Sequence, residues 1–430
     1  MKLCIPVMTI LMAALLPASV WAQEPVQPSD PPTTDPPATP PTAAPTDPPT
    51  AAPATPPAAA PATSPAAAPA TSPTEQSTSK AKFNISGHVN RAVLVYYDGE
   101  ESEVQHVDND QSSTRVMTSV DYALEPELTI GLQMQLEFES NPSNRVTQNA
   151  STPAPTFLER RLQVYIKSKA GTLWLGQGNT ASNAASEVDL SGTSIAVYSA
   201  IGDHSGALQF RADNEAASLT GLTNDAAMSN MDGLHRQDRL RYDSPSLSGF
   251  TLSGTLLNDS AWDLAVRHAL DSESLKLRGA LAVADGSRIG RPYLQVNGSI
   301  SGLMSNGFNL TVAGGARDLD DADYTPWFFY GKIGYKLPVT AVAADFGYFS
   351  ENAQEDVSGT AVGLAVMQTL GSLKDGVESI GLRQTSMPNW AVELFFGYRY
   401  LFLNDDISFE GATVGTKAIH TGMAGARVKF

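Results

Sequence analysis

The sequence of 430 residues has a single cysteine, Cys4, which lies in the first segment of the chain. The rest of the protein therefore has no thiol and no disulfide. From residue 81 onward there is no apolar run long enough for a transmembrane helix. Cations are also scarce, because 28 Lys and Arg stand against 45 Asp and Glu, for a formal net charge of −17. This balance disfavours nucleic acid as a partner.

The N-terminus has the features of a secretory signal peptide. Lys2 precedes an apolar run, and the small residues Val20 and Ala22 occupy the −3 and −1 positions of a cleavage site before Gln23. We therefore predict a signal peptide over residues 1–22. An uncleaved anchor is the alternative, which the short apolar run disfavours. A large secreted protein without disulfides indicates a bacterial origin.

Residues 23–80 are rich in proline, alanine and threonine. They contain 18 prolines and no aromatic residue, so they cannot bury a core and are expected to be disordered. Some 50 residues of polyproline-like chain, at about 3.1 Å each, could reach roughly 150 Å. We predict a linker here.

Residues 81–430 alternate apolar and polar side chains. In "RQDRLRYDSPSLSGFTLSGTLL", residues 236–257, two alternating stretches flank a Ser- and Gly-rich turn. Glycine is frequent and helical periodicity is almost absent, so this domain is predicted to be all-β. Sixteen strands are predicted, at 83–97, 113–124, 127–140, 157–169, 171–178, 236–244, 249–258, 261–270, 273–284, 290–302, 306–317, 324–336, 339–350, 358–370, 389–403 and 417–430.

The connections alternate between tight turns and long polar loops, such as 98–112, 141–156 and 351–357. Short turns on one side and long loops on the other are typical of an outer-membrane β-barrel. The polar strand faces predict a wet interior, while the apolar faces contact lipid. A soluble sandwich would reverse this arrangement. Strands of about ten residues with aromatic residues near their ends favour the barrel.

Several motifs resemble a known family. They are "FNISGHVNRAVLVYYDGE" as a first strand, "VDNDQSSTRV" as the entry to the second, "GTLWLGQGNTASNAASEVDLSGT" as the fifth strand and the start of an inward-folded third loop, "RLRYDSPSLSGF" as the hairpin at the sixth strand, and "AGARVKF" as a closing strand. In this order they resemble the Gram-negative porins, which are trimeric 16-stranded general diffusion porins.

The resemblance implies a homotrimer in the outer membrane, in contact with lipid and lipopolysaccharide. It also implies that Phe430 is part of a signal for the barrel-assembly machinery. The family as a rule lacks a proline-rich tail. The 371–388 stretch is longer than an ordinary turn, so an extra hairpin and 18 strands remain an alternative.

Alternation fixes which side chains line the lumen. Leu240 and Tyr242 face lipid, so Arg239 and Arg241 point into the pore. The same rule places further arginines on the lumenal wall, namely Arg115, Arg161, Arg278 and Arg399. The long loop 179–235 carries acids, and the resemblance implies that Glu187, Asp189 and Asp203 face these arginines across a constriction. For each arginine the alternative is a wall salt bridge away from the constriction.

Arg91 departs from the pattern, because it shares its face with Val89, Val93 and Val95. A charge facing lipid near the midplane costs a few kcal/mol. The resemblance places the first strand at the subunit interface, so we predict that Arg91 lies in a trimer contact. A local bulge that turns Arg91 inward is the alternative.

No residue pattern predicts a cofactor, a metal site or an enzyme. The acidic stretches at 108–111 and 317–324 could bind Ca²⁺, or Mg²⁺ bridged to lipopolysaccharide, but solvated loops are the favoured interpretation. A barrel phospholipase would need a nucleophile beside an outward histidine, and His420 has none evident.

The sequence thus predicts a porin for small hydrophilic solutes. A solute-specific channel and a structural or adhesive surface barrel are the alternatives. Residues 23–80 should hang in the periplasm, where they could contact peptidoglycan. Ion selectivity stays open, because the net charge favours cations and the arginine wall favours anions.

Overall fold

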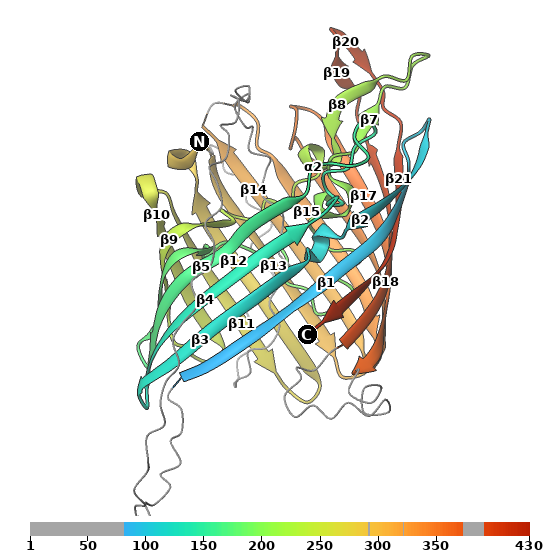
Figure 1. Ribbon diagram of the computed structural model, residues 1–430. Helices are drawn as coiled ribbons and strands as arrows, with labels where there is room; N and C mark the ends of the chain where they lie inside the picture. Colours follow the sequence, from blue (N-terminus) through green and yellow to red (C-terminus); the bar gives the residue numbers. More distant parts are fainter. Residues whose placement is uncertain (1–80, 291–292, 321, 373–390) are drawn as a thin grey trace, which may run out of the picture. The chain divides into compact units, whose positions relative to one another are not determined.

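The computed structural model describes residues 81–290, 293–320, 322–372 and 391–430, and most of its regular structure is β-strand (Figure 1). The predicted signal peptide, the proline-rich linker and most of the 371–388 stretch lie outside these residues. Within the described ranges, no helix is long and apolar enough to cross a membrane. The wall strands are β1 (Ala81–Tyr97), β2 (Ser102–Asp108), β3 (Arg115–Glu125), β4 (Leu128–Glu139), β5 (Thr156–Ser168), β6 (Gly171–Asn179), β9 (Arg236–Asp243), β10 (Phe250–Leu257), β11 (Trp262–Asp271), β12 (Leu275–Asp285), β13 (Tyr293–Met304), β14 (Phe308–Leu319), β15 (Trp327–Lys336), β16 (Thr340–Ser350), β17 (Ser358–Ser372), β18 (Ala391–Leu403) and β21 (Ile419–Lys429).

These strands form one closed antiparallel sheet. Apart from β2 and β3, which both pair with β1, consecutive wall strands are hydrogen-bonded to each other, and β21 pairs with both β18 and β1. The end of the chain completes the seam, because the backbone N–H groups of Gly87 and Phe430 each donate to the other's carbonyl at 3.0 Å. A closed sheet leaves no unpaired edge in the hydrocarbon, which is why strands can span a bilayer only as a barrel. The predicted β-barrel is confirmed.

The second wall strand is split into two pieces. β1 pairs with β3 over 81–88 and with β2 over 91–97, and the 3₁₀ turn η1 (Asp110–Ser112) separates the two pieces. Counted as one strand, they give a wall of sixteen strands. Because β17 pairs directly with β18, the eighteen-strand alternative is not realised in the wall. The expected loop over 98–112 is wrong in part, since β2 lies within it.

The exposure of side chains alternates along the wall strands. On β10, Leu252 and Leu256 are each 62% exposed, whereas Thr251, Ser253 and Thr255 are buried. The apolar face therefore points out of the barrel and the polar face points in. A soluble sandwich would have the opposite arrangement, so the structure favours the lipid-facing assignment.

The remaining short elements lie in the connections. The turn from β9 to β10 requires glycine, because Gly249 has a φ of +84° and a Cβ there would lie 2.4 Å from the Ala269 carbonyl oxygen. The hairpins of the loop end extend beyond the wall (Figure 1). The short elements are α1 (Gly202–Ser205), α2 (Asn224–Ala227), η2 (Asn258–Ser260), η3 (Ser287–Ile289), β7 (Gln209–Arg211), β8 (Leu219–Thr223), β19 (Ile407–Phe409) and β20 (Ala412–Val414).

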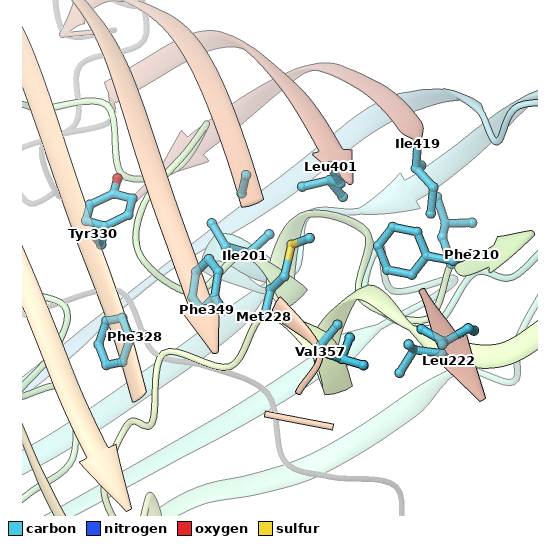
Figure 2. Close-up of a cluster of buried hydrophobic side chains, with 14 of the residues drawn as sticks. Ile201, Phe210, Leu222, Met228, Phe328, Tyr330, Phe349, Val357, Leu401 and Ile419 are labelled. Atoms are coloured by element: carbon cyan, nitrogen blue, oxygen red, sulfur yellow. The ribbon is translucent and has the colours of Figure 1, made fainter. Parts of the chain in front are cut away.

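The main hydrophobic cores lie inside the barrel, between the wall and the connection from β6 to β9. Figure 2 shows Met228 and Ile201 of this connection beside Phe349 and Leu401 of the wall. These wall residues point inward on the same faces as Asp345 and Arg399, so the expectation of a wet interior is wrong for this part of the lumen. Inward apolar residues mark where a loop packs.

Candidate functional site

Residues 180–235, which we call loop three, connect β6 to β9 and enter the lumen. The loop is fixed at its start by polar groups of β10 and β11. The Ala181 N–H donates to Thr255 Oγ1 at 2.8 Å, and the Ser182 N–H donates to the Asp263 carboxylate at 2.9 Å. Arg267 donates to the Ala181 carbonyl at 3.2 Å. Loop three is therefore held at its first residues by side chains rather than by a strand.

The next part of loop three follows β13. The N–H groups of Val188 and Leu190 donate to the hydroxyl oxygens of Ser299 and Ser301, each at 2.9 Å. Ser299 also donates to the Ala185 carbonyl at 2.7 Å. Two inward hydroxyls on alternate residues thus take the place of a neighbouring strand. This spacing aligns 185–190 with the wall because inward residues of a strand recur every second position.

Loop three then contacts wall strands farther round the barrel. Asp189 forms a buried ion pair with Lys332 of β15 at 2.7 Å. Arg399 of β18 donates to the Tyr198 carbonyl at 2.6 Å and pairs with Asp345 of β16 at 2.5 Å. The loop is thus bonded to β10 and β11 at its start and to β15 and β18 by residue 198.

Apolar packing holds the rest of loop three. Full burial of a large apolar side chain contributes about 1.5–3 kcal/mol, so several such residues outweigh a single hydrogen bond. The largest cluster joins loop residues to wall residues that lie near the loop-side ends of their strands, and Figure 2 shows part of it. Its loop members are Ile201, Leu208, Phe210, Leu222, Ala227, Met228 and Met231, and its wall members include Tyr96, Phe328, Tyr330, Phe349, Leu401 and Ile419.

Two of the predicted wall arginines hold the base of loop three. Arg239 donates to the carbonyls of Asn179 and Gly176 at 2.9 and 2.8 Å. Arg241 donates to the Thr180 carbonyl at 2.9 Å and pairs with Asp243 at 2.8 Å. Both side chains lie on the inner face, as predicted. Their bonds to backbone carbonyls fix the point where the chain leaves the wall.

The other predicted arginines are distributed over the wall. Arg115 and Arg161 are buried on the inner face of β3 and β5, and Arg115 donates to the Ser113 carbonyl at 2.9 Å. Arg278 lies near the turn between β11 and β12, where it pairs with Asp271 at 2.7 Å. The structure therefore places Arg278 in a wall salt bridge, whereas Arg399 lies against loop three.

The predicted acids of loop three are buried. Glu187 accepts a hydrogen bond from Asn230 at 2.9 Å, and Asp203 accepts one from the Tyr198 hydroxyl. Burial, with the nearby Asp232 and Asp203 carboxylates, raises the pKa of Glu187 well above its usual value. Burial also raises the pKa of Asp232 to about 6. Uncharged carboxyl groups are less costly to bury than ions, which explains the direction of both shifts.

Among the inward cations that sequence reasoning missed are Arg160 and Lys332. Arg160 pairs with Glu137 inside the barrel, although strict alternation places Arg160 outside. A register shift between Gln135 and Leu136 of β4 opposite this point turns both Arg160 and Arg161 inward. Lys332 follows the alternation rule along β15, so the sequence pattern could have placed it on the inner face.

Arg91 lies on the outer face. It donates to the backbone and side-chain oxygens of Ser140 at 2.7 and 2.9 Å and lies 3.5 Å from Asp108. The pairing of β1 with β21 runs without a register shift, so no bulge turns Arg91 inward. The side chain borders a surface cavity of about 370 Å³, lined also by Val89 and Phe138.

Other expectations concern the chain end and metals. The backbone of Phe430 pairs with Gly87, and a Cβ on Gly87 would lie only 2.8 Å from the Phe430 ring. His420 faces outward and accepts or donates a hydrogen bond with the Tyr398 hydroxyl at 2.7 Å. In the described part of the chain, no three His, Cys, Asp or Glu side chains gather as a metal site.

Comparison with known proteins places the chain in a family. The family model described as Gram-negative porin matches residues 54–378. No curated protein matches the sequence.

Solved structures with a similar fold include the anion-selective porin from Comamonas acidovorans, at 14% identity and a TM-score of 0.52, over 81% of this chain and 100% of that one. They also include OmpT of Vibrio cholerae in its trimer form, at 14% identity and a TM-score of 0.48, over 81% and 99%. The outer membrane channel DcaP of Acinetobacter baumannii has 10% identity and a TM-score of 0.47, over 82% and 99%. With its closed sixteen-stranded wall and its match over most of the sequence, the chain belongs to the Gram-negative porins and is a general diffusion porin of the outer membrane.

Proposed function

We propose that loop three constricts the channel and sets the size of the hydrophilic solutes that pass. The observation that carries this proposal is the course of loop three, from Asp263 on β11 to Arg399 on β18. A segment bonded to both sides of a barrel narrows the water-filled section between them. The solutes are small and polar because the remaining inner face is polar.

We further propose that the wall arginines and the loop acids shape the field in this constriction. Arg115, Arg161, Arg239 and Arg241 lie on the inner face of β3, β5 and β9, and Glu187 and Asp203 lie in loop three. Opposite charges on two sides of a narrow section orient dipolar solutes, and Glu187, whose pKa is raised by burial, contributes to this field only when it is ionised. Arg239 and Arg241 have a second role in this proposal, because they also hold the base of the loop.

The test compares two loop-shortened variants in planar bilayers. In the first, a short Gly-Ser bridge replaces residues 183–231. We expect a higher single-channel conductance and passage of larger polyethylene glycols. The matched control replaces residues 405–411, which form part of an outer loop, and should leave both quantities nearly unchanged. Unchanged conductance in a folded first variant would refute the constriction.

The same recordings distinguish a solute-specific channel from a general one. Conductance that rises linearly with solute concentration supports general diffusion, whereas saturation supports a binding site for one solute. We propose no enzymatic activity. If replacing His420 with alanine removed a lipase signal from purified protein, that proposal would be wrong.

We propose that the protein is a homotrimer and that Arg91 lies in the subunit contact. Arg91 is 42% exposed on a face of apolar side chains, beside the cavity next to Phe138. A charge left on this face costs about 2–4 kcal/mol at mid-bilayer, and a subunit contact would remove that cost. Arg91→Glu should convert trimers to monomers on unheated gels, whereas Lys169→Glu at an exposed turn should not.

The predicted partners beyond the subunits stay proposals. Lipid and lipopolysaccharide would surround the apolar outer face, and the barrel-assembly machinery would recognise Phe430. The proline-rich residues 23–80, after removal of 1–22, would lie in the periplasm and contact peptidoglycan. If deletion of 23–80 leaves co-sedimentation with cell wall unchanged, the last proposal fails.

A further inference from the structure

Charged side chains at the turn end of the lumen are mostly cations. We consider the described inward residues of wall strands that lie within three positions of a strand's turn end. Eight are cationic, namely Lys82, Lys167, Arg241, Lys276, Arg278, Lys336, Arg427 and Lys429. Three are acidic, namely Asp243, Asp271 and Glu393. The turn end faces the periplasm in outer-membrane barrels.

The three carboxylates of this region are already neutralised. Asp243 pairs with Arg241 at 2.8 Å, and Asp271 pairs with Arg278 at 2.7 Å. Glu393 pairs with both Arg427 and Lys429, each at 2.7 Å.

The excess of cations over carboxylates in this region therefore comes mostly from four lysines that have no carboxylate partner among these three. Lys82, Lys167 and Lys276 are exposed and Lys336 is half-buried, so all four are accessible to solutes. Glu125, the last residue of β3, and Glu273, in the turn before β12, add two carboxylates, while Glu127 pairs with Lys169. The surplus at this end stays positive.

The loop end carries the opposite charge. The described side chains of the outer loops other than loop three include three cations, Arg145, Arg288 and Lys417. They include eleven carboxylates, namely Asp98, Glu100, Glu101, Asp320, Asp323, Glu351, Glu355, Asp356, Asp405, Asp406 and Glu410. These outer loops thus carry eight more carboxylates than cations, and Arg211 of loop three pairs with only two of them, Asp98 and Glu101, so a net negative charge remains around this mouth of the lumen.

The two regions act separately on passing ions. A wall strand such as β14 has 12 residues, and a strand of this length tilted by about 40° spans roughly 30 Å along the barrel axis. The Debye length is about 10 Å at 0.1 M salt. The ends are therefore about three screening lengths apart, and neither cancels the field of the other.

We propose that the lumen is bipolar, with a cationic vestibule at the periplasmic mouth that gathers small anions and an acidic extracellular mouth that gathers small cations. This inference rests on the proposed function as an open, water-filled channel. Its consequence is rectification. A voltage that is positive on the extracellular side drives cations in through the acidic mouth and anions in through the vestibule, so both accumulate in the lumen. The opposite voltage depletes both.

The experiment measures current at equal and opposite voltages through oriented single channels of the full mature protein. A Thr413→Cys variant on the exposed β20 hairpin, labelled with an impermeant maleimide, reports the orientation. We expect about twofold more current with the extracellular side positive at about 0.1 M KCl, and a ratio near one at about 1 M KCl, where the Debye length is ~3 Å.

Two variants test the residues. Lys167→Glu with Lys276→Glu leaves six cations facing five carboxylates in the vestibule, and should abolish the rectification. Lys169→Glu, two positions from Lys167 but on the turn outside the lumen, is the control and should retain most of it. Both variants must give the wild-type conductance at high salt, which establishes that they fold.

The outcomes separate this inference from the proposed function. Open channels that pass equal currents at low salt, or that rectify with the opposite sign, overturn the bipolar lumen and leave the channel function intact. Protein that folds but gives no current steps overturns the open channel on which the inference rests.

Discussion

Loss of the buried cation Lys332 should release loop three from the wall. The Lys332 side chain is 0% exposed and its partner Asp189 is 5% exposed, at an N to O distance of 2.7 Å. Lys332 also donates to the Val197 carbonyl at 2.7 Å. Removing one partner of a buried pair costs about 3–5 kcal/mol, because the other charge is left without compensation. We therefore expect Lys332→Met to lower the free energy of loop opening by this amount.

Hydrogen exchange measures that free energy directly. Since each 1.4 kcal/mol is a factor of ten, exchange of the amides of residues 189–197 should accelerate by about two to nearly four powers of ten. The double variant Lys332→Met with Asp189→Asn removes both charges and should recover most of the protection. The control Lys169→Met breaks an exposed pair with Glu127 and should change nothing. Unchanged exchange in the first variant would show that apolar packing alone holds the loop, and would refute this reasoning.

Three further predictions concern packing, closure and pH. Phe349→Ala removes a ring with 0% exposure from the core between loop three and wall, and should reduce the free energy of unfolding in detergent by about 3–5 kcal/mol; a loss below 1 kcal/mol would contradict the packing described. Gly87→Val should prevent closure of the barrel, because a Cβ there lies 2.5 Å from the Arg115 carbonyl oxygen; the expected result is loss of the folded, heat-modifiable gel band, while Ser86→Val should keep it. The pKa values of Glu187 and Asp232 are raised by burial, so the loop is most stable at a pH below their usual values and loses stability as the pH rises above them, for Asp232 through a pKa of about 6. Loop-amide exchange, corrected for its intrinsic pH dependence, should accelerate over that range and less so in Glu187→Gln; no change with pH would count against the burial.

The wall of the barrel could be predicted from the sequence because it depends on local pattern. Alternation with a period of two separates a lipid face from a lumenal face, and the exposure of Leu252 against the burial of Thr251 confirms it. The same rule placed Arg239 and Arg241 inside. Turn residues such as Gly249 marked the tight connections. Each of these features involves residues that are close in the sequence.

Local pattern failed where the register changes. The bulge at Arg160 turns an even-numbered residue inward, and nothing in the alternation marks it. The second wall strand is divided at η1, so a segment that looks like a polar loop adds β2 to the wall. Both features are decided by what lies on the neighbouring strand, because a bulge or a break must match the hydrogen-bond pattern opposite it.

The sequence by itself determined the sixteen strands, their inner and outer faces and the closed sheet, since a bilayer accepts no open edge. Only the tertiary structure decided the path of loop three. That path depends on contacts between distant residues, such as Asp189 with Lys332 and Met228 with the wall around Phe349. Inward apolar residues look like exceptions to a polar face until the loop that covers them is in place. The tertiary structure also decided how the charges of one acidic chain are divided between the two mouths of the lumen, because strand direction, and not composition, assigns each residue to an end.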